Sequence, residues 1–309
     1  MDNEHVIKAD SQIEPVSTGN PTVAVAFGGG GARGFAHIHI IETLNELGIR
    51  PVAISGASIG AIMGAAMASG MSGAEIREYT RAMLGSRSEV LSRIWRMRPT
   101  KMGDVISGGF RLGQFNVERI LTTMLPDSLP ATFEELDIPT QIIVTDFYAQ
   151  QEAVCASGDL INAIAASAAI PALFRPVVRD GRYMIDGGIF NPVPFDHLHG
   201  LADIIIGIDV VGGPSGDDGE SPTTTDLMFG ASQLMMQSII GMKLKINRPD
   251  IFLRPRVSEF RVLDFLKVDE ILTASVDVRD EFKHALDAII TYSIKNGVPA
   301  KTPDVLQTP

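Results

Sequence analysis

The chain has 309 residues, of which 45% are hydrophobic and 20% charged, the balance of an ordinary globular protein with a substantial core. Its formal net charge of −11 argues against nucleic acid as the main partner, because phosphate binding needs a basic face. The single cysteine, Cys155, excludes an internal disulfide framework and fits a reducing compartment.

The N-terminal quarter contains two strand-to-helix units. Residues 1–21 are polar and unpatterned, and we expect a mobile tail without a signal peptide. A strand is predicted over 22–27, followed by four glycines and a helix over 34–47 with apolar residues at three-residue spacing. A second strand over 51–56 breaks at Gly-Ala-Ser-Ile-Gly and continues as a small-residue helix over 59–69.

The uncharged run 51–74 is long enough to cross a bilayer. Its many glycines and serines are poor lipid-facing material, so we interpret it as a buried strand, turn and helix.

The rest of the chain alternates between the same two patterns. Strands are predicted at 140–147, 152–156, 182–186, 203–211 and 251–253, and helices from Ser72 onward and at 116–124, 160–169, 226–247 and 268–295. This alternation predicts one α/β domain around a largely parallel sheet. We expect that domain to span 22–299, with the motifs in 22–211, further helices in 223–297 and a tail at 300–309.

The Gly-Ala-Ser-Ile-Gly segment matches G-x-S-x-G between a strand and a helix, the context of a nucleophile elbow. Such a turn needs glycines for clearance, here Gly56 and Gly60, and exposes the hydroxyl of Ser58. The upstream glycine loop offers backbone N–H groups at a helix start, where a developing negative charge is stabilised. Together these features predict acyl transfer by an activated serine.

Other readings of the same glycines are weaker. The spacing Gly29, Gly31, Gly34 also fits a dinucleotide-binding loop, but the second strand ends without the acidic residue that would bind ribose. A Walker A loop would need Lys-Ser or Lys-Thr after Gly34, where Phe35 stands. His37 and His39 diverge on a helix, which disfavours a metal site.

A serine nucleophile needs a base, and the residues offer two kinds. Asp186 ends a predicted strand before two glycines, at the edge where α/β sheets assemble their sites. The alternative is a triad made of Ser58, Asp186 and one of His197, His199 or His284.

With these residues in view, the sequence resembles the patatin-like phospholipase family. The family's three signatures correspond to GGGARG at 29–34, GASIG at 56–60 and DGG at 186–188, in the family's order. The segment ASAAIPALF at 166–174 is also similar. The resemblance covers about 22–211 and implies a three-layer α/β/α fold around a largely parallel sheet.

The resemblance implies a Ser–Asp dyad without a catalytic histidine. Ser58 would be the nucleophile and Asp186 its base. Gly29, Gly30 and Gly31 would supply the oxyanion hole, with Arg33, Gly34, Gly56, Gly60, Gly187 and Gly188 in support. No cofactor and no metal are implied, and the substrates would be fatty-acyl esters, typically phospholipids or lysophospholipids.

One further stretch offers a hint about lipid. Residues 87–101 gather basic side chains around Trp95, which suggests peripheral contact with an anionic membrane face. We therefore expect a cytoplasmic, peripherally membrane-acting lipid acyl hydrolase of unknown oligomeric state. The alternative is a regulatory or lipid-binding protein that keeps the fold with little turnover, and a nicotinamide-binding protein is the weakest option.

Overall fold

The computed structural model describes residues 21–84, 115–214 and 221–296. Within them, eight strands form one sheet in the order β5-β6-β3-β2-β1-β7-β8, with β4 also paired to β3. The strands are β1 (Val23–Phe27), β2 (Ala53–Ala57), β3 (Thr140–Asp146), β4 (Gln151–Cys155), β5 (Val177–Arg179), β6 (Arg182–Asp186), β7 (Ile204–Ile208) and β8 (Ile251–Leu253). In this order, the neighbours β3-β2-β1-β7-β8 pair in parallel. The strands β4 and β6 pair antiparallel with β3, and β5 pairs antiparallel with β6.

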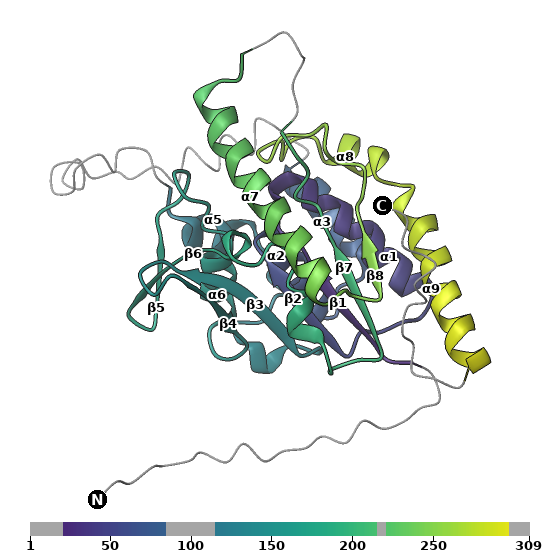
Figure 1. Cartoon of the computed structure of the whole chain (residues 1–309). Helices are drawn as coiled ribbons and strands as arrows, with labels where there is room; N and C mark the ends of the chain where they lie inside the picture. Colours follow the sequence, from purple (N-terminus) through teal and green to yellow (C-terminus); the bar gives the residue numbers. More distant parts are fainter. Residues whose placement is uncertain (1–20, 85–114, 215–220, 297–309) are drawn as a thin grey trace, which may run out of the picture.

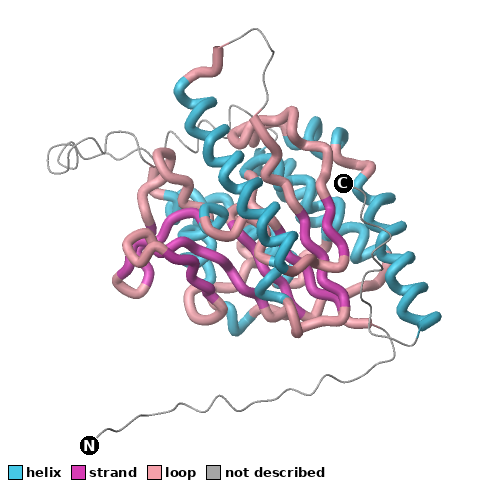
Figure 2. Tube along the Cα trace, in the orientation of Figure 1, coloured by secondary structure: helices cyan, strands magenta, loops and turns pink. Residues whose placement is uncertain are grey.

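Helices cover both faces of this sheet (Figures 1 and 2). One face carries α1 (His37–Glu46), α2 (Ile59–Ala68), α3 (Gly73–Leu84), α5 (Val117–Met124), α6 (Leu160–Ser167), α8 (Val268–Ala274) and α9 (Val278–Asn296). The other carries α7 (Thr224–Ile246) and the short 3-10 helix η5 (Phe195–Leu198). The chain thus has the expected three-layer α/β/α fold, with one layer much thinner than the other.

The strand sequences explain the two-sided burial. All five residues of β1, of β2 and of β7 are buried, as their continuous apolar runs predict for strands covered on both faces. Alternate residues of β1 face opposite layers: Val25 and Phe27 pack under α1 and α2, while Ala24 and Ala26 face η5 and α7. Small residues on the second side let these elements approach the sheet closely.

Two segments that are distant in the sequence meet along one side of β3. Residues 142–146 of β3 pair with β4 on one side, so β2 and β6 must share the other side. The last β2 pair is Ala57 with Ile143, and the next β3 residue, Val144, pairs with Asp186. The residue that follows β2 and the residue that ends β6 are therefore neighbours in space, although 128 positions separate them in the chain.

Some predicted elements differ from the structure. The single helix expected over 268–295 is two helices, broken at Ser275–Asp277, because α8 packs beside α3 while α9 turns to lie along α1. The helix expected over 34–47 begins as a 3-10 turn, η1 (Gly31–Ala36), before α1. The strand expected over 203–211 ends at Ile208, although Asp209, Val210 and Val211 remain buried. The short strand β5 was not predicted.

Two sequence expectations concern membranes. In the described ranges 21–84, 115–214 and 221–296, no helix is long and apolar enough to cross a bilayer. The run 51–74 forms β2, α2 and the start of α3 instead. The basic stretch 87–101 lies outside the described residues.

Candidate active site

Ser58 occupies the sharp turn between β2 and α2. Its backbone has φ 54° and ψ −124°, a left-handed conformation that is strained for a non-glycine residue. The turn is held by Ser167, whose hydroxyl accepts from the Ser58 N–H at 2.8 Å and donates to the Ile143 carbonyl at 2.6 Å. Tertiary contacts therefore fix the position of the Ser58 side chain.

The glycines of G-x-S-x-G are required by close backbone approaches. A Cβ on Gly60 would lie 2.0 Å from the Phe27 carbonyl oxygen, and one on Gly56 would lie 2.6 Å from the Gly60 oxygen. A Cβ on Gly34, in the glycine loop, would lie 2.3 Å from the Ile59 side chain. These contacts place the start of α2 against the end of β1, so the Ser58 turn and the glycine loop lie together.

Asp186 is the hydrogen-bond partner of Ser58. Its Oδ2 accepts from Ser58 Oγ at 2.6 Å, and its Oδ1 accepts from the Gly188 N–H at 2.8 Å. Both residues are buried, with 5% and 4% exposure. Burial raises the pKa of Asp186 to about 6, because the hydrogen bonds from Ser58 and Gly188 only partly offset desolvation of the carboxylate.

The residues after Asp186 must also be small. A Cβ on Gly187 would lie 1.9 Å from the Ile143 carbonyl oxygen, and one on Gly188 would lie 2.7 Å from a methyl group of Met236. Thr145 donates its hydroxyl to the Asp186 carbonyl at 2.9 Å. The D-G-G segment is thereby wedged between β3 and α7.

The glycine loop follows β1 and borders Ser58. A Cβ on Gly29 would lie 3.2 Å from the Ser58 Cβ, so the loop backbone touches the serine. The Gly29 N–H donates to the Pro192 carbonyl at 2.9 Å and is committed to the fold. The N–H groups of Gly30 and Gly31 have no acceptor within the described part of the chain. We therefore restrict the predicted oxyanion donors to Gly30 and Gly31. Gly29 is removed from the predicted set, because its N–H already donates to Pro192.

Two buried side chains hold this loop. Arg33 donates from Nε to the Phe260 carbonyl at 2.7 Å and from its other guanidinium nitrogens to the carbonyls of Val211 and Gly213. It anchors the loop to neighbouring segments and points at backbone oxygens, where no anion could sit. His37 Nε2 lies 2.8 Å from the Gly28 carbonyl, and burial lowers its pKa to about 4, so the ring is neutral and donates there.

Two cavities meet at Ser58. The larger, of about 360 Å³, is lined almost entirely by apolar side chains from α2, α3, α5 and the segments near 170 and 265, among them Phe35, Ile62, Met83, Leu121 and Phe174. The smaller, of about 160 Å³, includes Gly30, Gly31 and Asp186 and is closed on one side by Met228, Phe229, Ser232 and Met236 of α7. Ser58 thus lines both a larger apolar cavity and a smaller cavity beside α7.

The histidines predicted as alternative bases lie elsewhere. His197 Nε2 is 3.2 Å from Glu152 Oε1, an interaction that raises the pKa of the histidine, and His199 packs edge-on against Phe195. His284 lies on α9, on the other face of the sheet from η5. In the described residues the side-chain partner of Ser58 Oγ is a carboxylate, which favours the dyad over the triad.

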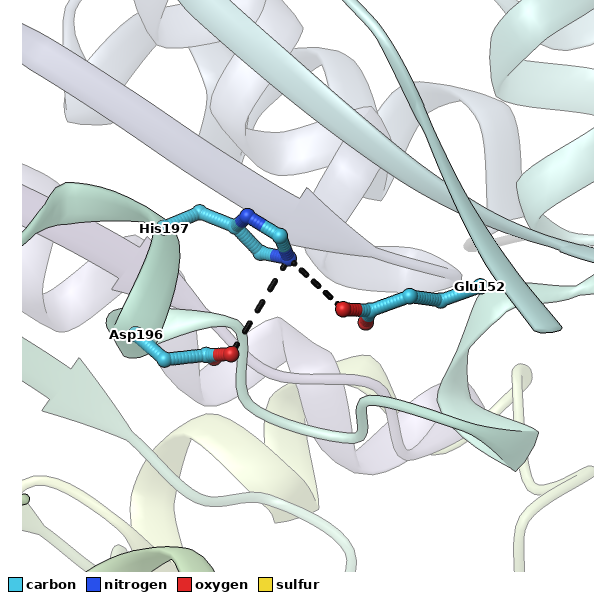
Figure 3. Close-up of side chains that lie close together, drawn as sticks. All are labelled: Glu152, Asp196 and His197. Carbon is cyan, nitrogen blue, oxygen red and sulfur yellow. Dashed lines mark ion pairs between the residues drawn. The ribbon is translucent and has the colours of Figure 1, made fainter.

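One group of metal-ligating residue types occurs in the described part: Glu152, Asp196 and His197, shown in Figure 3. Its two carboxylates already have hydrogen-bond partners. Lys243 donates to Asp196 Oδ2 at 2.7 Å, and Asn191 donates to Glu152 and Asp196 at 3.1 and 2.9 Å. We interpret this cluster as an ion-pair network that docks α7 on η5.

Comparison with known proteins decides the family. The model of the patatin-like phospholipase family, described as "Patatin-like phospholipase", matches residues 25–199. The chain belongs to the patatin-like phospholipase family. The matched region contains the glycine loop, the Ser58 turn and Asp186, which confirms the resemblance inferred from the sequence.

Similar members of the family differ in length. An uncharacterized NTE family protein of Mycobacterium tuberculosis is 33% identical over 209 residues, covering 67% of this chain and 54% of the relative. The human patatin-like phospholipase domain-containing protein 6 is 27% identical over 290 residues, covering 84% of this chain and 20% of the relative. The chain therefore spans about half or less of the length of these relatives.

Among solved structures, VipD from Legionella pneumophila aligns over 87% of this chain and 67% of its own, with a TM-score of 0.48 and 15% identity.

Proposed function

We propose that this chain is a lipid acyl hydrolase that cleaves fatty-acyl esters of phospholipids or lysophospholipids through a Ser58–Asp186 dyad. The observation that carries the proposal is the 2.6 Å hydrogen bond from Ser58 Oγ to a buried carboxylate, at the junction of two cavities. Membership of the patatin-like phospholipase family supports the same reaction class.

In the proposed reaction, the ionised Asp186 accepts the Ser58 proton as Oγ attacks the ester carbonyl. The N–H groups of Gly30 and Gly31 stabilise the tetrahedral oxyanion, and α2 begins directly behind the serine, with the positive end of its dipole toward the new charge. Asp186 then returns the proton to the departing alcohol, which leaves Ser58 acylated. A water molecule, deprotonated by Asp186, attacks the acyl-enzyme, and Asp186 passes this proton to Ser58 Oγ as the bond to the acyl group breaks and the fatty acid is released.

The two cavities define how an ester substrate would be oriented at Ser58. The larger cavity offers apolar walls suited to a fatty-acyl chain, because burial of each methylene contributes about 0.8 kcal/mol. The smaller cavity holds the polar groups of Ser232 and Gln233 and borders the oxyanion donors. We assign the acyl chain to the larger cavity and the alcohol part of the ester to the smaller one.

The test is intact-mass analysis after treatment with a fluorophosphonate probe. Wild type should gain one adduct and Ser58→Ala none, whereas Ser232→Ala, a matched change in the same cavity, should keep the adduct. Asp186→Asn should slow labelling at least a hundredfold, in line with the usual contribution of a general base.

The result would separate two classes of protein. An adduct that survives in Ser58→Ala would place the nucleophile elsewhere and overturn the dyad. Absence of any adduct on wild type, together with no turnover of a short-chain ester, would favour a lipid-binding protein on the same fold.

A further inference from the structure

The outer face of α7 carries a row of exposed apolar side chains. We call it the outer stripe of α7, and its members are Leu227, Met228, Leu234, Met235, Met242 and Ile246, which are 52–84% exposed. At 100° per residue they fall within an arc of about 120° around the helix. Ser238 and Lys245 are exposed in the same arc. Single exposed apolar residues are ordinary, but several on one side of a single helix mark a docking surface.

The opposite side of α7 fixes the direction in which the stripe points. Ile240, Met236 and Leu244 pack into the core formed with η5. Lys243 is bound to Asp196 of that helix at 2.7 Å. Figure 1 shows α7 lying across the thin side of the sheet, with no further helix drawn in front of it. The stripe is therefore held outward by the packing of the inner face.

The stripe reaches the mouth of the candidate active site. Met228 is 52% exposed and also lines the smaller cavity, next to Phe229 and Ser232. Val262 lines the smaller cavity together with these α7 residues, and its neighbour Leu263, which is 42% exposed, lines the larger cavity. Exposed apolar residues thus occur on the solvent face of α7 and also at the borders of the two cavities that contain Ser58.

The charges along α7 favour lipid over a second copy of the chain. The only acidic residue of α7 is Asp226, which caps its first turn, and residues 227–249 contain no Asp or Glu, although the chain as a whole has a net charge of −11. The same segment has three basic residues near its end, Lys243, Lys245 and Arg248. Two copies would each bring that negative charge, whereas a phospholipid surface accepts an apolar helix face with basic residues beside it.

We propose that the outer stripe of α7 docks on a phospholipid surface and brings the cavity mouth at Met228 to the lipid. The stripe enters the boundary between headgroups and acyl chains, with Lys245 and Arg248 at the headgroup level. The proposal rests on the proposed function, because it is the lipid ester at Ser58 that would have to leave this surface and enter the cavities.

The experiment compares two double variants for binding to vesicles of phosphatidylcholine with phosphatidylglycerol, measured by co-sedimentation. All chains carry Ser58→Ala, so that the vesicles stay intact. Leu227→Gln with Leu234→Gln removes two members of the stripe that line neither cavity, and glutamine has nearly the helix propensity of leucine. We expect vesicle binding to weaken about tenfold.

The matched control is Leu47→Gln with Leu201→Gln. These leucines are 44% and 49% exposed and lie at the end of α1 and just before β7, where the parallel strands begin, whereas Ser58 lies where β2 ends. This pair should bind vesicles as the parent does. With Ser58 restored, both double variants should hydrolyse a water-soluble short-chain ester within about twofold of wild type. If the first pair does not fold, Met242→Gln with Ile246→Gln tests the other end of the stripe.

Three results would overturn the inference: a parent chain that does not bind vesicles, equal binding by parent and stripe variants, or equal losses in stripe and control variants. A dimer of the parent that the stripe variants dissociate, with vesicle binding unchanged, would assign the stripe to a second copy. Loss of ester turnover and probe labelling in wild type would reject the proposed function instead, and vesicle binding by the Ser58→Ala chains would still decide the role of the stripe.

Discussion

At the scale of single residues, the protonation state of Asp186 controls the proposed reaction. Burial holds its pKa at about 6, and only the ionised form can accept the Ser58 proton. We expect kcat/KM for a soluble ester to rise with pH and to level off above an apparent pKa of about 6. The profile of His197→Gln should be the same, because His197 is paired with Glu152. If the rise of kcat/KM with pH disappeared in His197→Gln, that result would contradict the dyad.

The same pKa predicts how stability depends on pH. A carboxyl with a pKa raised from 3.8 to about 6 binds its proton more tightly in the folded state than in the unfolded one. Its contribution to stability is therefore present below the unfolded pKa and is lost as pH rises through the folded one. Replacing Asp186 with Asn removes this loss.

As the pH rises from about 4 to about 8, wild type should lose on the order of 2–3 kcal/mol of unfolding free energy that Asp186→Asn does not lose. Urea unfolding at both pH values measures this difference. Asp137→Asn, the same change on a carboxylate with 58% side-chain exposure, serves as the control. A variant whose stability follows the wild-type pH dependence would show that Asp186 is not the buried titrating group.

The residues of the site were predictable to different degrees. Ser58 and Asp186 stand in local motifs whose glycines are needed for backbone clearance, so the sequence alone predicts both as members of the candidate site. Ser167 and Thr145 were missed, because their role depends on contacts made only after β3, β6 and α6 have packed. Gly29 was placed among the oxyanion donors because nothing local reveals that Pro192 accepts from its N–H.

At the scale of elements, α7 contains a glycine that the fold does not require. A Cβ on Gly241 would meet no atom within 4 Å, whereas one on Gly230 would lie 3.3 Å from Pro214. Gly241→Ala should therefore stabilise the protein by about 0.5–1 kcal/mol, since alanine loses less entropy in a helix interior. Gly230→Ala, the same change in the same helix, should gain less. Urea unfolding of both variants measures the difference, and equal gains would argue that α7 is loosely docked.

The elements that the sequence predicted best are those with a clear local pattern of apolar residues. The apolar runs of β1 and β2 and the three-residue spacing in α1 each follow from one local pattern. The break between α8 and α9 did not, because 268–295 is a good helical sequence and the turn at Ser275–Asp277 serves two different partners. The short β5 has only three residues and is defined by its antiparallel partner β6.

At the scale of the whole molecule, the segments after residue 211 complete the same core as the motifs before it. Phe282, Leu286 and Ile289 of α9 are at most 2% exposed and pack in one cluster with β1 and α1. Glu42 of α1 accepts hydrogen bonds from Arg77 of α3 and Arg279 of α9, each at 2.6 Å. Arg33 of the glycine loop is bound to the Phe260 carbonyl. The segments before and after residue 211 therefore depend on one another.

This dependence predicts one cooperative unfolding transition. Phe282→Ala should reduce the free energy of unfolding by about 3–5 kcal/mol, the usual result of removing a buried ring. If the domain is a single unit, circular dichroism and fluorophosphonate labelling at Ser58 should lose their signals at the same urea concentration, and both midpoints should fall together in the variant. Leu266→Ala, at a residue 44% exposed, should move neither midpoint appreciably. Labelling that persists after most helical signal is lost would mean that β1, β2 and β6 hold the site without α9, and that 22–299 is two units.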